Sequence, residues 1–200
     1  MNFLAHLYLS ENKTESIVGN FIADHVKGNT IDLYNDDIKS GIRFHRSVDS
    51  FTDHNTTTHE AIIHLRPYYR KYAGVVLDMY YDHFLASGWD QWSSEPLTDF
   101  SIRMFEVLKS SGQLMPLRSQ RLLAYLAEND LLVKYKDLDG LKLALTGISK
   151  RTTFISNIET AAEHLNDHYS YYSDSFNHFF PQLVEFSKIT NQESALKEVE

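Results

Sequence analysis

The sequence contains no cysteine, and only four of its 200 residues are proline and eight are glycine. The absence of cysteine excludes disulfide bonds and thiolate chemistry, so a reducing cytoplasm is the simplest location. The scarcity of proline and glycine argues against a many-turned β-sandwich and favours long helices. The sequence has no run of about 18 apolar residues, so we expect no transmembrane helix. The opening residues, MNFLAHLYLSENKTES, have no basic leader and are not typical of a signal peptide.

The sequence has fewer basic than acidic residues, 19 against 27, so its formal net charge is −8 at pH 7. This balance excludes a global electrostatic attraction to nucleic acid or to an anionic membrane, and leaves only a local basic patch open. Hydrophobic residues make up 42% and aromatic residues 13%, enough for a sizeable core. We expect a single domain over residues 1–200, with a polar tail at 191–200 that frays.

Helical periodicity predicts an all-α protein built as an irregular helical bundle. Residues 2–9 fit a short helix or a strand equally well, and 14–26 fit a helix. A central helix is expected over 37–51 and a long one over 68–86. Further helices are expected over 97–110, 117–129, 138–149 and 159–188, the last of them with a break between 167 and 175.

The central helix carries the densest group of ionisable side chains, in the stretch GIRFHRSVDSFTD at residues 41–53. His45 and Asp49 lie four residues apart and therefore share one helix face. An imidazole and a carboxylate on adjacent turns can share one divalent metal ion. The alternative is an ordinary amphipathic helix, on which Asp49 forms an ion pair with Arg43 or Arg46.

Acidic and histidine side chains gather on four apolar or aromatic segments within the first 83 residues. They are His6, Asp24, His45, Asp49, Asp53, Asp78, Asp82 and His83. Each has an ordinary structural explanation as well; His6, for example, could be a core histidine bonded to a backbone carbonyl. Asp82 and His83 are neighbours on a helix and point about 100° apart, so one could bind a metal while the other supports it or acts as a general acid.

Several blocks of the sequence resemble, in the same order, the signature blocks of the bacterial acyl carrier protein phosphodiesterase family. These blocks are MNFLAHL (1–7), VGNFIADHVKG (18–28), GIRFHRSVDSFTD (41–53), DMYYDHFLASGW (78–89) and GLKLALTGISKRT (140–152). The resemblance implies an all-α, HD-like fold and a cytoplasmic, manganese-dependent hydrolase. It implies a reaction that removes the 4′-phosphopantetheine arm from holo acyl carrier protein and leaves apo acyl carrier protein.

The resemblance also implies roles for individual residues. On this basis we expect metal ligands at Asp24, His45, Asp49 and Asp82, for manganese or for magnesium or another divalent ion. We expect catalytic roles for His6, His83 and Arg46, the histidines as further ligands or proton donors and the arginine on a phosphate oxygen. We expect substrate or partner contacts from Lys27, Arg43, Arg118 and Arg121, because the carrier protein is acidic.

Two other functions remain open from the sequence. The first is an HD-like metal phosphohydrolase that acts on a small phosphate ester or a nucleotide through the same residues. The second is a non-enzymatic helical binding module, in which the acidic and histidine side chains form a salt-bridge network. Metal-dependent hydrolysis would exclude the binding module, and a requirement for the carrier protein would exclude the small substrate.

Overall fold

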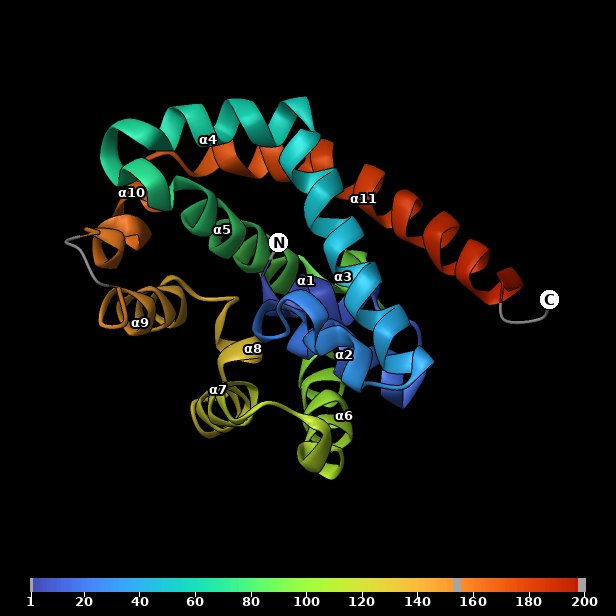
Figure 1. The fold of residues 1–200 in the computed structure, drawn as a ribbon. Helices are drawn as coiled ribbons and strands as arrows, with labels where there is room; N and C mark the ends of the chain where they lie inside the picture. Colours follow the sequence, from blue (N-terminus) through green and yellow to red (C-terminus); the bar gives the residue numbers. More distant parts are fainter. Residues whose placement is uncertain (1, 153–155, 198–200) are drawn as a thin grey trace.

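The computed structural model describes residues 2–152 and 156–197, which form helices and connecting turns with no strand among them. This confirms the all-α prediction, and Figure 1 shows the helices packed into one body. The helical content does not identify an HD arrangement, which stays a prediction. In the described part of the chain, no helix combines the length and the apolarity needed to cross a bilayer.

The helices are, in order, α1 (Phe3–Leu9), α2 (Thr14–Ile22), α3 (Asp36–His54), α4 (Thr56–Tyr69), α5 (Ala73–Ser87), α6 (Leu97–Ser110), α7 (Leu117–Glu128), α8 (Leu131–Lys134), α9 (Leu138–Ser149), α10 (Ala161–Asp167) and α11 (Tyr169–Lys197). Short 3-10 turns join several of them, among them η1 (Ala23–His25), η2 (Gly28–Leu33) and η3 (Arg70–Tyr72).

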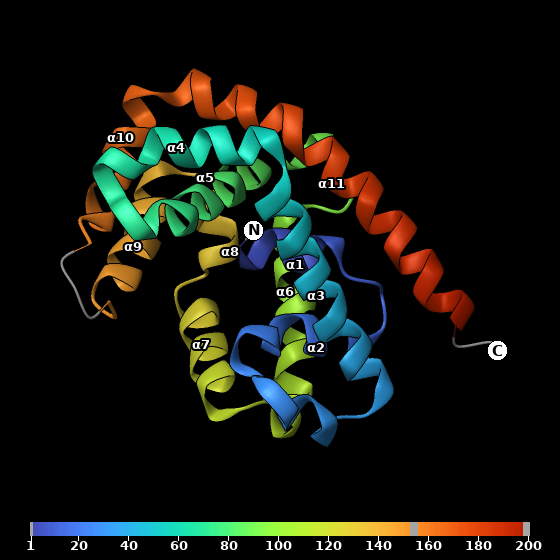
Figure 2. The same cartoon turned by 45° about the horizontal axis from the view of Figure 1, so that its top comes forward.

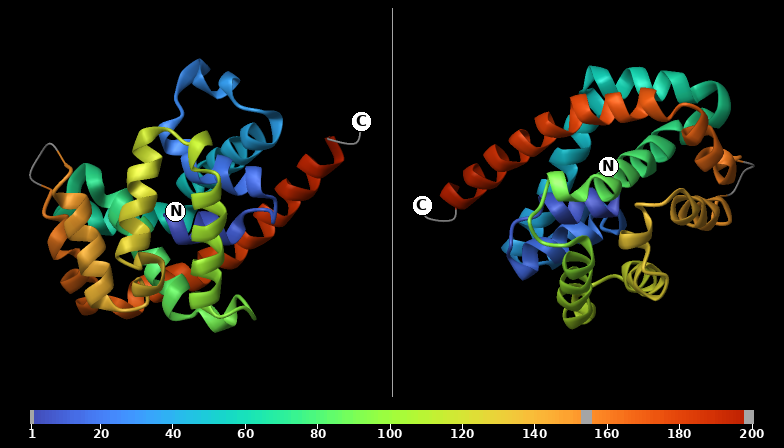
Figure 3. Two further views of the ribbon diagram at one scale, coloured as in Figure 1. Left: turned by 90° about the horizontal axis from the view of Figure 1, so that it is seen from below. Right: turned by 180° about the vertical axis from the view of Figure 1, so that it is seen from behind.

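Helix α5 lies at the centre of the molecule. Most of its side chains are buried, and Tyr80 and Tyr81 have no exposed surface. Helices α4 and α11 lie along one side of α5, whereas α7, α8 and α9 lie on the other (Figures 1 and 2). Helix α1 packs against α5 and α2, and the views from below and behind show it near the middle of the fold (Figure 3). The segments that carry the candidate site residues therefore meet near the middle of the fold.

Helices α2 and α3 touch through their backbones at two glycines. A Cβ atom added at Gly41 would lie 2.2 Å from the carbonyl oxygen of Ser16, and one added at Gly19 would lie 2.1 Å from that of Ile38. Real Cβ atoms do not approach other atoms so closely, so only glycine permits this packing. The contact fixes η1, which follows α2, close to the middle of α3.

The structure corrects one large element of the sequence-based prediction. The single long helix expected over 68–86 is divided, because α4 continues through Pro67 to Tyr69 and the backbone then turns at Arg70, with a φ of 50°. A residue with a positive φ cannot continue a right-handed helix, and α5 starts in a new direction after η3. The sequence gives no glycine or asparagine at this position to signal the break.

The other boundaries differ by smaller amounts. The helix expected over 14–26 ends at Ile22, and the polar stretch 53–58 is almost entirely helical because Asn55 alone separates α3 from α4. The helices expected over 97–110 and 138–149 have those bounds, and the break in the last segment falls at His168. The tail expected to fray continues α11 as far as Lys197, and residues 198–200 lie outside the described residues.

Gly41→Ala should lower the free energy of unfolding by about 1–3 kcal/mol, because the added methyl group meets rigid backbone of α2. Gly74→Ala is the matched control: its Cβ would meet nothing within 4 Å, and the site is helical. The control should leave stability unchanged or raise it by about 0.5–1 kcal/mol. Urea unfolding followed by circular dichroism measures both, and equal stabilities would contradict the close contact of α2 and α3.

Candidate metal centre

Two histidines and one aspartate bring their polar atoms together between α1 and α3. His6 Nε2 lies 3.1 Å from Asp49 Oδ1, and His45 Nε2 lies 3.2 Å from Asp49 Oδ2. The imidazole rings are stacked, with centroids 3.8 Å apart and planes at 14°. The three donor groups are within 4.8 Å of one another. The predicted shared face of His45 and Asp49 is therefore confirmed, and His6 joins it from α1.

Asp24 approaches the same point from η1. Its Oδ1 lies 3.5 Å from His45 Nε2, and its side chain is 66% exposed, whereas both histidines are buried. Asp24 thus forms the solvent side of the cluster, and the histidines form its protein side. Three of the four predicted ligands, together with His6, are brought together from three separate segments.

Asn20 holds one imidazole in a defined tautomer. The buried amide nitrogen of Asn20 donates to the carbonyl of His6 at 2.8 Å and to Ser10 Oγ at 2.7 Å. Its Oδ1, an acceptor, lies 2.9 Å from His45 Nδ1, so this ring nitrogen carries the hydrogen and donates it. His45 Nε2 then faces the carboxylates, and this is the nitrogen that would bind a metal ion in place of its proton. Histidine metal ligands in proteins are commonly oriented in this way.

The charges of the cluster favour a cation. Burial lowers the pKa of His45, but the hydrogen bonds that the ring donates to Asp24 and Asp49 outweigh burial and raise that pKa to about 9. Burial and the neighbouring His45 lower the pKa of His6 to about 4. Burial raises the pKa of Asp49, but hydrogen bonds from both histidines leave it below its ordinary value. The cluster therefore holds one positive charge between two carboxylates, at the position that the positive charge of a bound metal ion would take.

The donor spacing also fits a metal ion. Two ligands that lie about 2.1 Å from one ion, at angles of about 90–110°, are about 3.0–3.4 Å apart. The observed separations of 3.1, 3.2 and 3.5 Å agree with this geometry. A mixture of imidazole nitrogen and carboxylate oxygen suits several divalent ions, manganese among them. His6, His45, Asp49 and Asp24 are the residues that would hold such an ion.

Asp82 lies elsewhere, although the sequence analysis placed it among the ligands. Its carboxylate is fully buried and accepts hydrogen bonds from the backbone nitrogens of Leu4 and Ala5, at 2.8 and 3.1 Å. Burial raises the pKa of Asp82 to about 7, although the two backbone hydrogen bonds act to lower it. The first turn of a helix has free N–H groups that a carboxylate stabilises. Asp82 therefore anchors the N-terminus of α1, the helix that carries His6.

His83 and Arg46 are also committed to other partners. His83 is buried, with Nδ1 2.8 Å from the carbonyl oxygen of Tyr135 and Nε2 3.2 Å from the hydroxyl of Tyr169. Arg46 donates from Nη2 to the carbonyl of Val26 at 3.0 Å. Neither residue joins the histidine–aspartate cluster. The sequence analysis assigned their roles from the family resemblance, which does not give the direction of a side chain around its helix.

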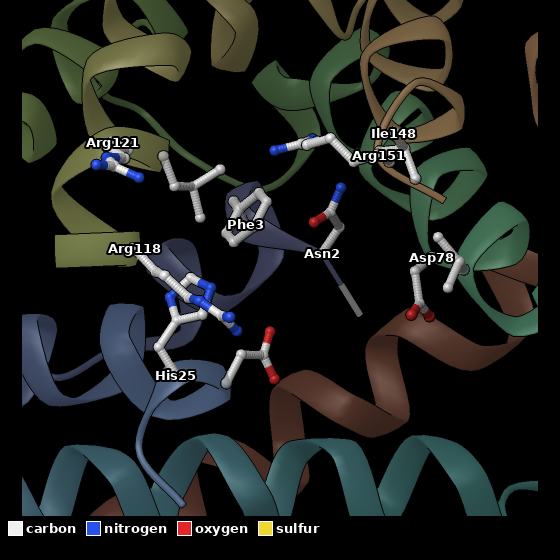
Figure 4. A pocket seen from close by; sticks show the side chains of 11 residues that line it. Asn2, Phe3, His25, Asp78, Arg118, Arg121, Ile148 and Arg151 are labelled. Carbon is white, nitrogen blue, oxygen red and sulfur yellow. The ribbon is translucent and has the colours of Figure 1, made fainter. Parts of the chain in front are cut away.

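A cavity of about 470 Å³ adjoins the exposed side of the cluster. Figure 4 shows the side chains that line this cavity. Asp24 is on its wall, and so are Arg118 and Arg121 of α7, as expected for substrate contacts. Arg43 and Lys27 are exposed and do not line it. The remaining lining residues are Asn2, Phe3, His25, Val75, Asp78, Leu122, Ile148 and Arg151. The volume is typical of a small-molecule site.

One wall residue has no role in the sequence analysis. His25 lines the cavity with its Nδ1 2.8 Å from the buried Ser119 Oγ of α7. The proximity of His25 to Asp24 was the available signal, and it does not indicate a cavity by itself. Arg151, which follows α9, lines the cavity as well, in agreement with the expectation that the basic residues of the sequence, Lys150 and Arg151 among them, lie at the mouth of the pocket.

Comparison with known proteins identifies a family over nearly the whole chain. Residues 1–183 match the sequence model of a family described as "Acyl carrier protein phosphodiesterase". The chain is 33% identical over 186 residues to a protein of that name from Escherichia coli O6:H1 (strain CFT073), covering 92% of this chain and 96% of the relative. It is 33% identical over 185 residues, with the same coverage, to the protein of that name from Shigella boydii serotype 18. No solved structure matches the chain significantly.

Proposed function

The chain belongs to the acyl carrier protein phosphodiesterase family, and on that basis we propose that it hydrolyses the phosphodiester that joins 4′-phosphopantetheine to holo acyl carrier protein. The products are apo acyl carrier protein and free 4′-phosphopantetheine, formed in the cytoplasm. The observation that carries this proposal is the meeting of His6, His45, Asp49 and Asp24 beside a cavity lined with arginines. Donors for a divalent ion and cations for a phosphate thus adjoin one space.

We assign the ion to His6, His45, Asp49 and Asp24, with manganese as the proposed metal and magnesium or another divalent ion as the alternative. An ion bound there neutralises phosphate charge and lowers the pKa of a coordinated water. His6 is thereby proposed as a ligand, because its Nε2 faces Asp49. Asn20 keeps His45 in the ligating tautomer, and Asp82 holds α1 in place.

Arg118 and Arg121 are proposed to bind the acidic substrate. They lie three residues apart on one face of α7, both side chains are exposed, and neither forms an ion pair within residues 2–152 and 156–197. The net charge of −8 opposes the approach of an acidic carrier protein, so a local basic surface is required. Lys27 and Arg43, which are exposed outside the cavity, are proposed as weaker contacts on its approach.

The cavity also supports a second candidate function, because its volume is that of a small-molecule site. In that case the same cluster would hydrolyse a small phosphate ester or a nucleotide, without a carrier protein. The two proposals share the metal centre and differ in substrate. Comparing turnover of holo acyl carrier protein with turnover of a small phosphodiester separates them.

Holo acyl carrier protein incubated with this protein and manganese should lose the mass of the phosphopantetheine arm, as read by intact-protein mass spectrometry. Chelation should stop the reaction and manganese should restore it, because the ion activates the water. His45→Ala and Asp49→Ala should each lower the rate by about 100-fold or more while remaining helical. His54→Ala, which changes an exposed histidine on the same helix, is the control and should keep the rate. Full activity of His45→Ala at limiting manganese would exclude the assignment.

Charge reversal of Arg118 and Arg121 to glutamate should raise the KM for holo acyl carrier protein by about tenfold. Added salt should reduce the difference in KM between wild type and this variant. Lys134→Glu with Lys136→Glu is the matched control, because both pairs change the net charge by −4 and these exposed lysines lie outside the cavity. Steady-state kinetics measures both pairs. Equal effects would show that only the total charge matters and that α7 is not a substrate-binding surface.

A further inference from the structure

Arg151 is held in a fixed position at the wall of the cavity. Its Nε donates to the carbonyl of Gly147 at 3.0 Å, at the C-terminal end of α9. Its guanidinium lies 5.7 Å from the centre of the Tyr125 ring, which belongs to α7. Two helices thus restrain one side chain, through a hydrogen bond and a cation–π contact. A restrained cation loses less side-chain entropy when it binds an anion.

Gly147 makes this arrangement possible. A Cβ atom added there would lie 2.4 Å from the hydroxyl oxygen and 3.2 Å from the Cζ of Tyr125. The Tyr125 ring therefore rests against the backbone of α9, and a larger residue at 147 would displace it. The position of the ring in turn sets the position of the guanidinium of Arg151.

Three arginines reach the same cavity, whose wall also carries Asp24 and Asp78. Arg118 and Arg121 come from α7 and Arg151 comes from the end of α9, and Figure 4 shows Arg118 and Arg151 entering the space from different sides. None of the three is in an ion pair in the part of the chain that the structure describes. Unpaired arginines that converge on one concave site bind phosphate well, because the guanidinium donates two parallel hydrogen bonds.

The proposed reaction changes the charge of the phosphate. Water attacks phosphorus, and the bond between phosphorus and the serine oxygen of the carrier protein breaks. That serine oxygen takes up a proton. The diester substrate carries one negative charge at its phosphate, whereas the monoester product carries about −1.5 to −2 near pH 7, because its second pKa is about 6. A group of three cations therefore gains attraction when the diester becomes a monoester.

We propose that Arg118, Arg121 and Arg151 form a phosphomonoester site that retains the product, with Arg151 as its preorganised member. This inference rests on the proposed function for the identity of the product, and the arginine site itself does not depend on the metal ion. Its consequence is that 4′-phosphopantetheine binds the metal-free protein and inhibits the loaded enzyme.

The direct test measures binding of 4′-phosphopantetheine to the EDTA-treated protein by isothermal titration calorimetry. Wild type should bind 4′-phosphopantetheine at least about tenfold more tightly than pantetheine, which lacks the phosphate, and inorganic phosphate should compete. Arg151→Gln should weaken binding about tenfold. Lys150→Gln removes a neighbouring exposed cation that does not line this cavity, and it should bind as wild type does. Equal affinity of Arg151→Gln and wild type, or of pantetheine and its phosphate, would overturn the proposal.

A second set of variants tests the support of Arg151 while leaving its charge in place. Gly147→Ala should weaken phosphopantetheine binding, because it displaces the Tyr125 ring. Adding Tyr125→Phe removes the hydroxyl that meets the new methyl group and keeps the ring, so the double variant should recover part of the affinity. Gly147→Ala with wild-type affinity would show that Arg151 is not preorganised by this contact.

The outcomes separate this inference from the proposed function. If Arg151→Gln loses phosphopantetheine binding and wild type does not hydrolyse holo acyl carrier protein, the anion site is supported and the proposed function is rejected. If wild type hydrolyses holo acyl carrier protein but the EDTA-treated protein does not bind phosphopantetheine, the proposed function is supported and the anion site is rejected.

Discussion

Two buried imidazoles share one carboxylate in this protein, and the rest of the structure keeps that arrangement in place. The rings of His6 and His45 are stacked 3.8 Å apart, and both turn Nε2 toward Asp49. Two imidazolium ions this close would repel each other strongly in a buried site, so the cluster holds one positive charge at a time. A divalent ion at that position satisfies both imidazoles as neutral ligands and offsets the charges of Asp49 and Asp24.

Three supports outside the cluster position its donors. Asp82 binds the first turn of α1 and so fixes His6, Asn20 orients His45, and the contact at Gly41 sets the distance from α2 to α3. Each support comes from a helix other than the one it positions. The geometry of the donors is thus a property of the packed core, and the cavity beside them adds cations from α7 and from the end of α9. The proposed site would combine a cation position with an anion position, as a phosphodiester hydrolase requires.

The sequence predicts some of these features well and others not at all. Helical periodicity gave the bounds of α6 and α9, and spacing by four placed His45 and Asp49 on one face, because both depend on local geometry. The break at Arg70 was missed because this residue adopts a positive φ that no local signal in the sequence marks. Asp82 was expected to be a ligand from the family resemblance, and its neighbours in the chain do not reveal that its carboxylate accepts hydrogen bonds from the first turn of α1. The roles of Asn20 and Arg151 depend on contacts between distant segments, which a single sequence does not contain.

The central claim is that His6, His45, Asp49 and Asp24 bind one divalent ion. Anomalous diffraction from a crystal of the protein soaked in manganese, recorded on both sides of the manganese absorption edge, tests it most directly. We expect one anomalous peak about 2.0–2.2 Å from His6 Nε2, His45 Nε2 and a carboxylate oxygen of Asp49, with Asp24 on its solvent side. A manganese peak at Asp82 would contradict the account. So would manganese bound elsewhere on the protein with no peak at the cluster.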